Sequence, residues 1–271
     1  MFLVFDIGGS KIRLALAEDG EKLGEIKIIE TPQNFKEGVG LLTKATLEIA
    51  QGIKINKISG GIAGVLDNEH TKLINSGNLS DWVQKSLKLE LENTLQAPVY
   101  LENDAALGGL GEAHRGAGRN KKIVAYVTIG TGVGGVRIVD GKIDEKSMGF
   151  EPGHQIINFD NEGPRYLENY ISGSALKKKY GKKPEDINNL EIWDEAARYL
   201  AYGLNNTILH WSPDIVVLGG SMVKSTGIPL EKIRTYLRSS LNIFPYIPQV
   251  EKSTLGDTST LEGALVYLKF H

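Results

Sequence analysis

Residues 6–16, DIGGSKIRLAL, and residues 128–139, TIGTGVGGVRIV, have the same layout in the two halves of the chain. Each continues an apolar run, turns at glycines and returns through a stretch in which apolar residues alternate with polar ones. This is the pattern of a β-hairpin. Because duplication of such a unit gives two domains of one architecture, we predict two similar α/β domains that face a central cleft.

The residues around the first hairpin predict a β-β-β-α-β order. Its elements are strands 2–7, 11–18 and 25–32, a helix over 36–51 and a strand over 57–64. Further along, we predict helices over 82–95, 105–116, 168–180, 190–211 and 229–241, and strands over 98–104 and 213–222. The domain boundary is expected near residue 118, giving domains 1–118 and 119–271. The last helix, from Ser259, is expected to cross back to the first domain.

Composition limits the classes of function. The chain has 271 residues, of which 41% are hydrophobic and 24% charged, with a net charge of −2 and no cysteine. The charge leaves no electrostatic footprint for nucleic acid, and no apolar run approaches the length of a membrane span. The N-terminus lacks the basic region and long apolar stretch of a signal peptide. We expect a cytoplasmic protein without disulfides or cysteine-ligated metal.

Three glycine loops are candidates for nucleotide binding, because glycine lets backbone N–H groups approach phosphate closely. The first loop supplies Asp6, Gly8, Gly9, Ser10 and Lys11, the second supplies Gly130, Thr131, Gly132 and Gly134, and the third supplies Gly219 and Gly220. The Asp6 carboxylate could hold Mg²⁺ through water. A flat base could lie against the backbone at Gly219 and Gly220. The alternative for each loop is a plain hairpin or tight turn. None has a Walker A or Rossmann pattern.

Polar residues that could recognise a sugar follow predicted strands and loops. Asn103 and Asp104 end an apolar strand, where the crevice of an α/β sheet lies, and Asp104 could accept a hydroxyl proton. Glu151 and His154 in EPGH suit vicinal hydroxyls; Glu168 and Asn78 are further candidates. The alternatives are a helix cap at Asn103 or Asp104, an exposed loop at His154, a helix-dipole partner at Glu168, and a cap beside Asn78.

In series, these segments resemble the ROK family (repressors, ORFs and sugar kinases). The resemblance rests on DIGGSKIR (6–13), GGIAGVLD (60–67), GNLSDW (77–82), LENDAALGGLGE (101–112), TIGTGVGGV (128–136), GFEPGH (149–154), LENYISGSAL (167–176), PDIVVLGGSM (213–222) and GDTSTLEGAL (256–265). The motifs occur in the family's order over nearly the whole chain.

The resemblance implies an actin/hexokinase-like (ribonuclease H-like) fold and a glucokinase-like enzyme that uses ATP and Mg²⁺. It implies that Asp104 is the general base, that Gly64 lies in the loop beside the sugar, and that Asn78, Asn103, Glu151, His154 and Glu168 contact the sugar. It also implies a homodimer. It leaves open which hexose is used, and whether ATP or polyphosphate is the donor.

One stretch departs from the family pattern. Many members carry a cysteine-rich zinc motif after E-x-G-H, whereas residues 155–167 here are short and contain no cysteine, with Tyr166 at the last cysteine position. The resemblance therefore implies no zinc and leaves the register of Glu168 less secure. Two alternatives remain: a sugar-binding regulator without catalysis, and a sugar-independent ATPase of the same superfamily. The first would be expected to lose Asp104 or a phosphate loop and to carry a DNA-binding domain.

Overall fold

The computed structural model describes residues 1–161, 163–224 and 227–271, and the chain divides into two compact units. Unit 1 comprises Met1–His114, Glu145–Gly149 and Thr258–His271. Unit 2 comprises Arg115–Asp144 and Phe150–Asp257. Within the described ranges, no helix combines the length and apolar character needed to cross a bilayer.

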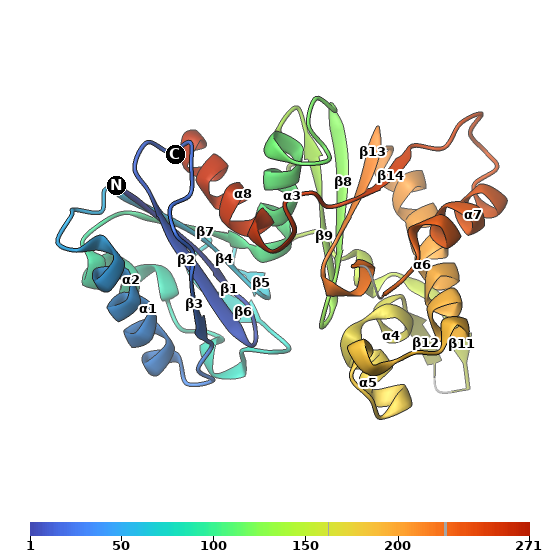
Figure 1. Ribbon diagram of the computed structural model, residues 1–271, viewed down its shortest axis with the longest axis horizontal. Helices are drawn as coiled ribbons and strands as arrows, with labels where there is room; N and C mark the ends of the chain where they lie inside the picture. Colours follow the sequence, from blue (N-terminus) through green and yellow to red (C-terminus); the bar gives the residue numbers. More distant parts are fainter. Residues whose placement is uncertain (162, 225–226) are drawn as a thin grey trace. The chain divides into compact units, whose positions relative to one another are not determined.

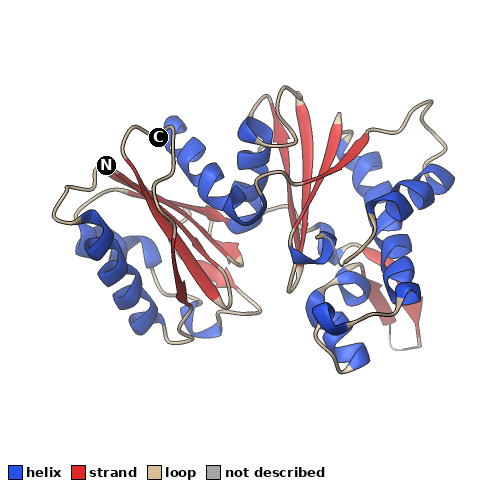
Figure 2. Ribbon diagram, viewed as in Figure 1, coloured by secondary structure: helices blue, strands red, loops and turns tan. Residues whose placement is uncertain are grey.

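Unit 1 is built on a five-stranded sheet with helices on both faces (Figures 1 and 2). The strands, in the order β3-β2-β1-β4-β7, are β1 (Phe2–Ile7), β2 (Lys11–Ala17), β3 (Lys27–Glu30), β4 (Lys57–Ile62) and β7 (Val99–Asn103). The helices are α1 (Phe35–Ala50), α2 (Leu87–Leu95), α3 (Asp104–Arg115) and α8 (Ser259–Tyr267). Strands β5 (Val65–Leu66) and β6 (Leu73–Asn75) form a small separate hairpin.

Unit 2 repeats this sheet. Its strands, in the order β10-β9-β8-β13-β14, are β8 (Ile123–Ile129), β9 (Val133–Val139), β10 (Lys142–Ile143), β13 (Ile215–Gly219) and β14 (Gln249–Lys252). Its helices are α4 (Glu168–Ile171), α5 (Gly173–Tyr180), α6 (Leu190–Trp211) and α7 (Leu230–Ser240). Strands β11 (Ile156–Asp160) and β12 (Gly163–Tyr166) form another hairpin.

The two sheets have the same pairing pattern, which confirms the predicted duplication. In each, two antiparallel pairs come first (β1 with β2 and β2 with β3; β8 with β9 and β9 with β10), and two parallel pairs follow (β1 with β4 and β4 with β7; β8 with β13 and β13 with β14). The mixed order is that of the actin/hexokinase-like fold, as predicted.

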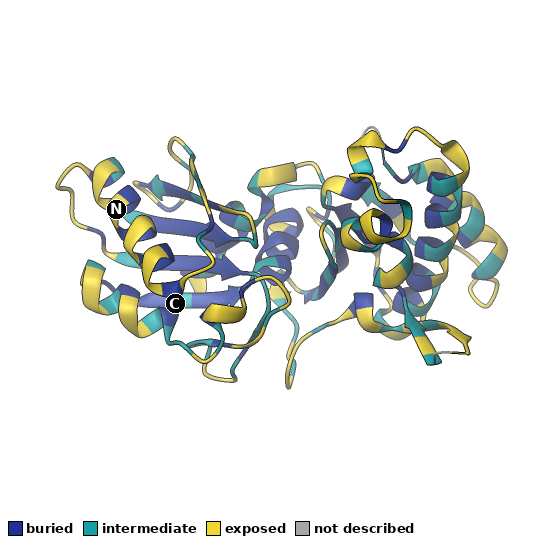
Figure 3. Ribbon diagram, turned by 90° about the horizontal axis from the view of Figure 1, so that it is seen from below, coloured by how far each residue is buried: buried dark blue, intermediate teal, exposed yellow. Residues whose placement is uncertain are grey.

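The central strands of each sheet are buried because helices cover them, and Figure 3 shows buried sheet strands and helices with exposed outer sides. In β1, Leu3, Phe5 and Ile7 join the core that includes residues of α1 and α2. Val4 between them is equally buried, because alternate side chains of a strand point to opposite faces and α8 packs against this sheet as well.

Two predicted helices differ from the observed ones. The helix expected over 82–95 begins only at Leu87, because the Ser86 side chain accepts from Leu89 N–H as an N-cap and Gln84 has a left-handed backbone, φ 64°. The helix expected over 168–180 is broken at Ser172, whose extended backbone and side chain cap α5. The short strands β5, β6, β11, β12 and β14 have no counterpart in the predicted elements.

Glycines in α3 and α8 let these two helices approach within backbone contact. A Cβ at Gly263 would lie 1.8 Å from the carbonyl oxygen of Leu107, and one at Gly111 would lie 2.3 Å from that of Ser259. Gly111 of α3 and Gly263 of α8 therefore make this close crossing possible, and α8 packs on the sheet beside β1 and β4.

We expect Gly263→Ala to lower the free energy of unfolding by about 1–3 kcal/mol, because the added methyl group forces the helices apart. Gly40 in α1 is the matched control: a Cβ there meets nothing within 4 Å, so Gly40→Ala should raise stability by about 0.5–1 kcal/mol through helix propensity. Urea unfolding followed by circular dichroism measures both. Equal effects of the two substitutions would contradict the packing argument.

Candidate active site

Three parallel strands of unit 1 end side by side, and candidate residues follow each of them. The register pairs Ile7 of β1 with Ile62 of β4, and Ile62 with Asn103 of β7. The glycine hairpin 8–11, the loop at Gly64 and Asp104 therefore lie along one edge of the sheet. This is the carboxyl edge, where open α/β sheets bind ligands.

Asp104 is the first residue of α3 and is half-buried. Its Oδ1 accepts from Ala105 N–H at 2.9 Å, its backbone carbonyl accepts from the Thr260 hydroxyl at 3.3 Å, and its Cα lies 3.0 Å from where a Cβ of Gly61 would be. The positive end of the helix dipole stabilises a carboxylate at this position. The Asp104 carboxyl group thus lies at the N-terminus of α3, with one oxygen bonded to the helix backbone.

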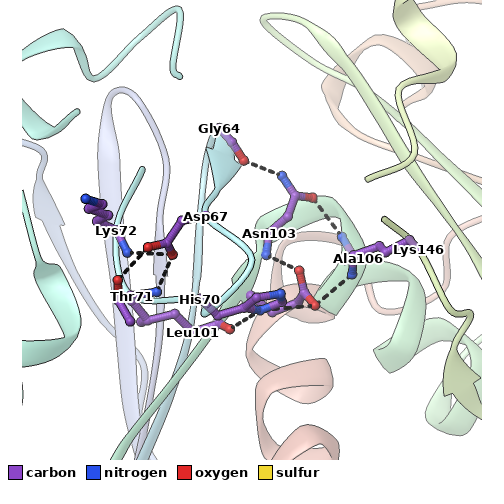
Figure 4. A network of polar contacts seen from close by, with 10 residues as sticks. Gly64, Asp67, His70, Thr71, Lys72, Leu101, Asn103, Ala106 and Lys146 are labelled. Carbon is purple, nitrogen blue, oxygen red and sulfur yellow. Dashed lines mark hydrogen bonds and ion pairs between the residues drawn. The ribbon is translucent and has the colours of Figure 1, made fainter. Parts of the chain in front are cut away.

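Asn103 has a structural role here that one of the alternatives foresaw. Its Oδ1 accepts from Ala106 N–H at 3.0 Å, which caps α3, and its Nδ2 donates to the Gly64 carbonyl at 3.0 Å. Figure 4 shows Asn103 between Gly64 and Ala106. One amide therefore joins the β7–α3 junction to the glycine loop after β4, while a second N–H of the same amide remains available for a ligand.

The Glu102 side chain contacts the backbone of Asn103 and side chains from two other segments, at Lys146 and His70. Its side chain is only 4% exposed; Oε1 accepts from Asn103 N–H at 2.8 Å, and Oε2 accepts from Lys146 Nζ at 2.8 Å. His70 Nδ1 lies 3.6 Å from Oε2 and 3.0 Å from the Leu101 carbonyl. The predicted site contained neither Glu102 nor Lys146.

The first glycine loop contacts the candidate sugar loop. A Cβ at Gly9 would lie 2.6 Å from Cβ of Asn78, so these segments, far apart in sequence, touch. Asn78, Ser10 and Lys11 are exposed, and Gly8 N–H donates to the Lys11 carbonyl at 3.0 Å within the hairpin. Asp6 is buried at the end of β1, and its Oδ2 lies 3.3 Å from Arg13 Nη1.

In unit 2, the three acidic and imidazole candidates form one cluster. His154 Nδ1 lies 3.5 Å from Glu151 Oε2, and His154 Nε2 lies 3.8 Å from Glu168 Oε1. The His154 ring also packs on Tyr166 with centroids 5.6 Å apart. Within the described part of the chain, no group of three His, Asp or Glu side chains is arranged to hold a metal ion.

Glu168 connects this cluster to the second glycine loop. Val133 N–H donates to its Oε2 at 3.3 Å, and a Cβ at Gly132 would lie 3.3 Å from the same oxygen. The loop carbonyls of Gly130 and Thr131 accept from Gly173 and Ser174 N–H at 2.7 and 3.2 Å. Gly130 N–H donates to the Gly132 carbonyl within the turn. Gly130 can therefore give a ligand open space, whereas its N–H is already bonded.

The three remaining candidate glycines of unit 2 differ in their surroundings. Gly134 lies in β9, opposite Thr128 of β8. Gly219 ends β13 and Gly220 follows it. A Cβ at Gly219 would lie 2.2 Å from the Tyr126 hydroxyl oxygen, and one at Gly220 would lie 2.2 Å from the Ile129 carbonyl oxygen. Gly220 also has φ 87°. Close packing and backbone conformation therefore already account for the last two glycines, as the tight-turn alternative had it.

The sequence pattern of the ROK family matches residues 3–270. The chain belongs to the ROK family. A glucokinase from Thermotoga maritima is 28% identical over 97% of this chain and 96% of its own. An N-acetyl-D-glucosamine kinase from Shigella flexneri is 29% identical over 97% of this chain and 98% of its own. A xylose repressor from Bacillus subtilis matches 74% of this chain.

Solved structures of ROK proteins have the same fold. A ROK family glucokinase from Streptomyces griseus in complex with glucose and AMPPNP superposes with a TM-score of 0.85, 25% identity and coverage of 100% of this chain and 99% of its own. A ROK hexokinase from Thermus thermophilus gives a TM-score of 0.79 at 26% identity over 99% and 98% of the two chains. Both span the two units found here.

The Glu151 carboxyl group allows a pH-dependent test of the cluster formed by Glu151, His154 and Glu168. Burial raises the pKa of its carboxyl; His154 opposes the shift and the charge of Glu168 adds to it. Because the pKa is higher in the folded state, ionisation of Glu151 lowers the stability of the folded protein at pH values above the unfolded pKa of about 4.5. The loss vanishes at lower pH, where the carboxyl group is protonated in both the folded and the unfolded state.

We therefore expect Glu151→Gln to raise the melting temperature slightly at about pH 8 and to lose this advantage near pH 4. Thermal scans of both proteins across this range measure the difference. Since the side chain is half-exposed, the effect is small. An advantage that grows toward acid would contradict the direction of the shift.

Proposed function

We propose that this protein is an ATP-dependent hexose kinase, glucokinase-like, which transfers the γ-phosphoryl group to a sugar hydroxyl with Asp104 as general base. The observation that carries the proposal is the register of unit 1, which lines up the hairpin at Gly8, the loop at Gly64 and Asp104 on one sheet edge. The kinases among its relatives, including the glucokinase with bound glucose and AMPPNP, support the assignment.

In the proposed reaction, positioning and charge neutralisation do most of the work. Asp104 accepts the hydroxyl proton as the oxygen attacks the γ-phosphorus and the bond to ADP breaks. Asn78, Asn103, Glu151, His154 and Glu168 bind the sugar hydroxyls. The loops at 8–11 and 130–134 enclose the phosphates, and the turn at Gly219 and Gly220 borders the adenosine.

Mg²⁺ carried by the nucleotide would neutralise phosphate charge. Asp6 fits as the residue that holds it, because hard cations prefer carboxylate oxygen. Arg13 at 3.3 Å from the carboxylate favours a contact through water over direct ligation, since direct ligation would bring the cation beside a guanidinium group.

A coupled assay of ADP release with and without a hexose panel, starting with glucose, tests the proposal. Sugar-stimulated release with matching sugar phosphate supports it. ADP release that ignores sugar would instead mean an ATPase, and sugar binding with no sugar phosphate formed from either ATP or polyphosphate would mean a regulator; either result overturns the proposal. Sugar phosphate formed from polyphosphate but not from ATP would correct the donor. A homodimer, which the family resemblance implies, is measured in parallel by sedimentation.

Asp104→Asn is expected to lower kcat by about 10²–10⁴-fold while sugar affinity stays within a small factor, because the amide cannot accept the proton. The substitution keeps an Oδ1 that can accept from Ala105 N–H, so α3 should remain intact. Steady-state kinetics and sugar-binding calorimetry measure the two effects. Near-normal turnover would remove Asp104 from the role of base.

Gly130→Ala tests the second phosphate loop. A Cβ at Gly130 meets nothing within 4 Å and the residue has no positive φ, so the fold should tolerate the methyl group. A phosphate in that open space would be displaced by it, and we expect KM for ATP to rise about tenfold or more with an unchanged melting temperature. Gly40→Ala, equally unobstructed but on α1, is the control. Unchanged KM would exclude phosphate contact at Gly130.

A further inference from the structure

Lys146 lies in sequence between two segments of unit 2 but belongs to unit 1. Residues 115–144 and 150–257 belong to unit 2, yet Glu145–Gly149 between them belongs to unit 1. Lys146 anchors this short segment by donating to Glu102, and its side chain is only 15% exposed. The Lys146 ammonium group is thus brought from the strand β10 side of the chain into the β7–α3 network of unit 1 (Figure 4).

We propose that Glu102 and Lys146 form a positioning pair, which fixes the backbone at the β7–α3 junction and thereby aims the Asp104 carboxylate at the acceptor hydroxyl. The inference rests on the proposed function, in which Asp104 is the base. Lys146 Nζ donates to Glu102 Oε2 and Glu102 Oε1 accepts from Asn103 N–H, so both side chains make their contacts at this junction within unit 1.

The first step of the argument concerns the junction. Asn103, directly before Asp104, is held at three points: its N–H by Glu102, its Oδ1 by Ala106 N–H and its Nδ2 by the Gly64 carbonyl. With the preceding peptide fixed in this way, little freedom remains for the Cα–Cβ direction of Asp104. A displacement of about 1 Å at a reacting group can cost on the order of 10²-fold in rate.

The second step concerns charge. A carboxyl group that is 4% exposed needs close polar partners to keep it in place, and Lys146 at 2.8 Å is the nearer of the two groups facing Oε2. His70, the other group, is presented by a loop in which Asp67 accepts from Thr71 and Lys72 N–H. Without Lys146, Glu102 would be drawn toward His70 or water and would release Asn103 N–H.

The third step concerns the chain beyond Lys146. Phe150 returns to unit 2, and Glu151 of the candidate sugar cluster follows it directly. The pair therefore fastens the segment leading to Glu151 onto the junction that carries Asp104. A buried ion pair is weak as a source of stability, since its desolvation offsets its attraction, which favours a positional role over a stabilising one.

The test compares Lys146→Met, Lys146→Arg, Glu102→Gln and the double variant Glu102→Gln/Lys146→Met with the wild type. Lys146→Met should lower kcat with the best hexose about 10–100-fold, with KM for ATP within about twofold. Lys146→Arg, which keeps the charge, should recover most of the rate. The double variant leaves no unpaired charge, so it should recover the melting temperature but not kcat.

Lys269→Met is the matched control, since it removes an exposed ion pair of the same unit, to Glu21 at 2.6 Å. Recovery of kcat together with stability in the double variant would overturn the proposal, because the pair would then be only structural. So would a Lys146→Met effect no larger than that of the control.

Amide hydrogen exchange over residues 102–106, without substrate, separates this inference from the proposed function. Lys146→Met should speed exchange there at least tenfold, while peptides of α1 exchange as in the wild type. If no hexose is phosphorylated by the wild type, the proposed function fails, and faster exchange would still show that the pair holds the junction. Unchanged exchange would overturn the positioning pair whatever the activity.

Discussion

A buried carboxylate at the end of β7 holds the site of unit 1 together. Glu102 binds the N–H of Asn103 on one side and the ammonium of Lys146 on the other. Burial of a polar group this far from water is costly unless the group is hydrogen-bonded, and both partners of Glu102 lie at 2.8 Å. The consequence is a fixed turn from strand to helix at the residue that we propose as the base.

The duplicated sheets put equivalent turns to different uses. The hairpins after β1 and β8 have the same layout, yet the first is closed by Gly8 and Lys11 and contacts Asn78, whereas the second is supported by the start of α5 and by Glu168. Gly219 and Gly220, by contrast, are needed for close packing on β8. Similar glycine patterns thus serve two purposes: some glycines leave open space that a ligand could occupy, and others allow neighbouring atoms to pack closely against the backbone.

The region after E-x-G-H is stabilised without cysteine. The β11–β12 hairpin carries an Asp160–Arg165 ion pair, and Asn158 donates to the Tyr170 hydroxyl at 3.1 Å. Tyr170 in turn stacks on Tyr199 of α6 with centroids 3.9 Å apart. Tyr166, at the position where the resemblance places a cysteine, packs on His154 instead. Aromatic and ionic contacts therefore hold this chain's own version of the segment.

The sequence by itself determined the features that depend on local pattern. Alternation and glycine turns identified both hairpins and the parallel strands other than β14, and the polar end of one strand indicated Asn103 and Asp104 as candidates, because periodicity and turn chemistry act over a few residues. Motifs in family order gave the ROK assignment, and the asparagine cap of α3 was among the alternatives foreseen.

Only the tertiary structure decided what depends on residues far apart in the chain. Glu102 and Lys146 are separated by 44 positions, and nothing in either neighbourhood indicates their pairing. The contact of Gly111 with α8 and the contact of Gly9 with Asn78 are equally nonlocal. The short strands β5, β11 and β14 were missed for the same reason: a few residues carry too little periodicity, and partners supplied by the fold define them as strands.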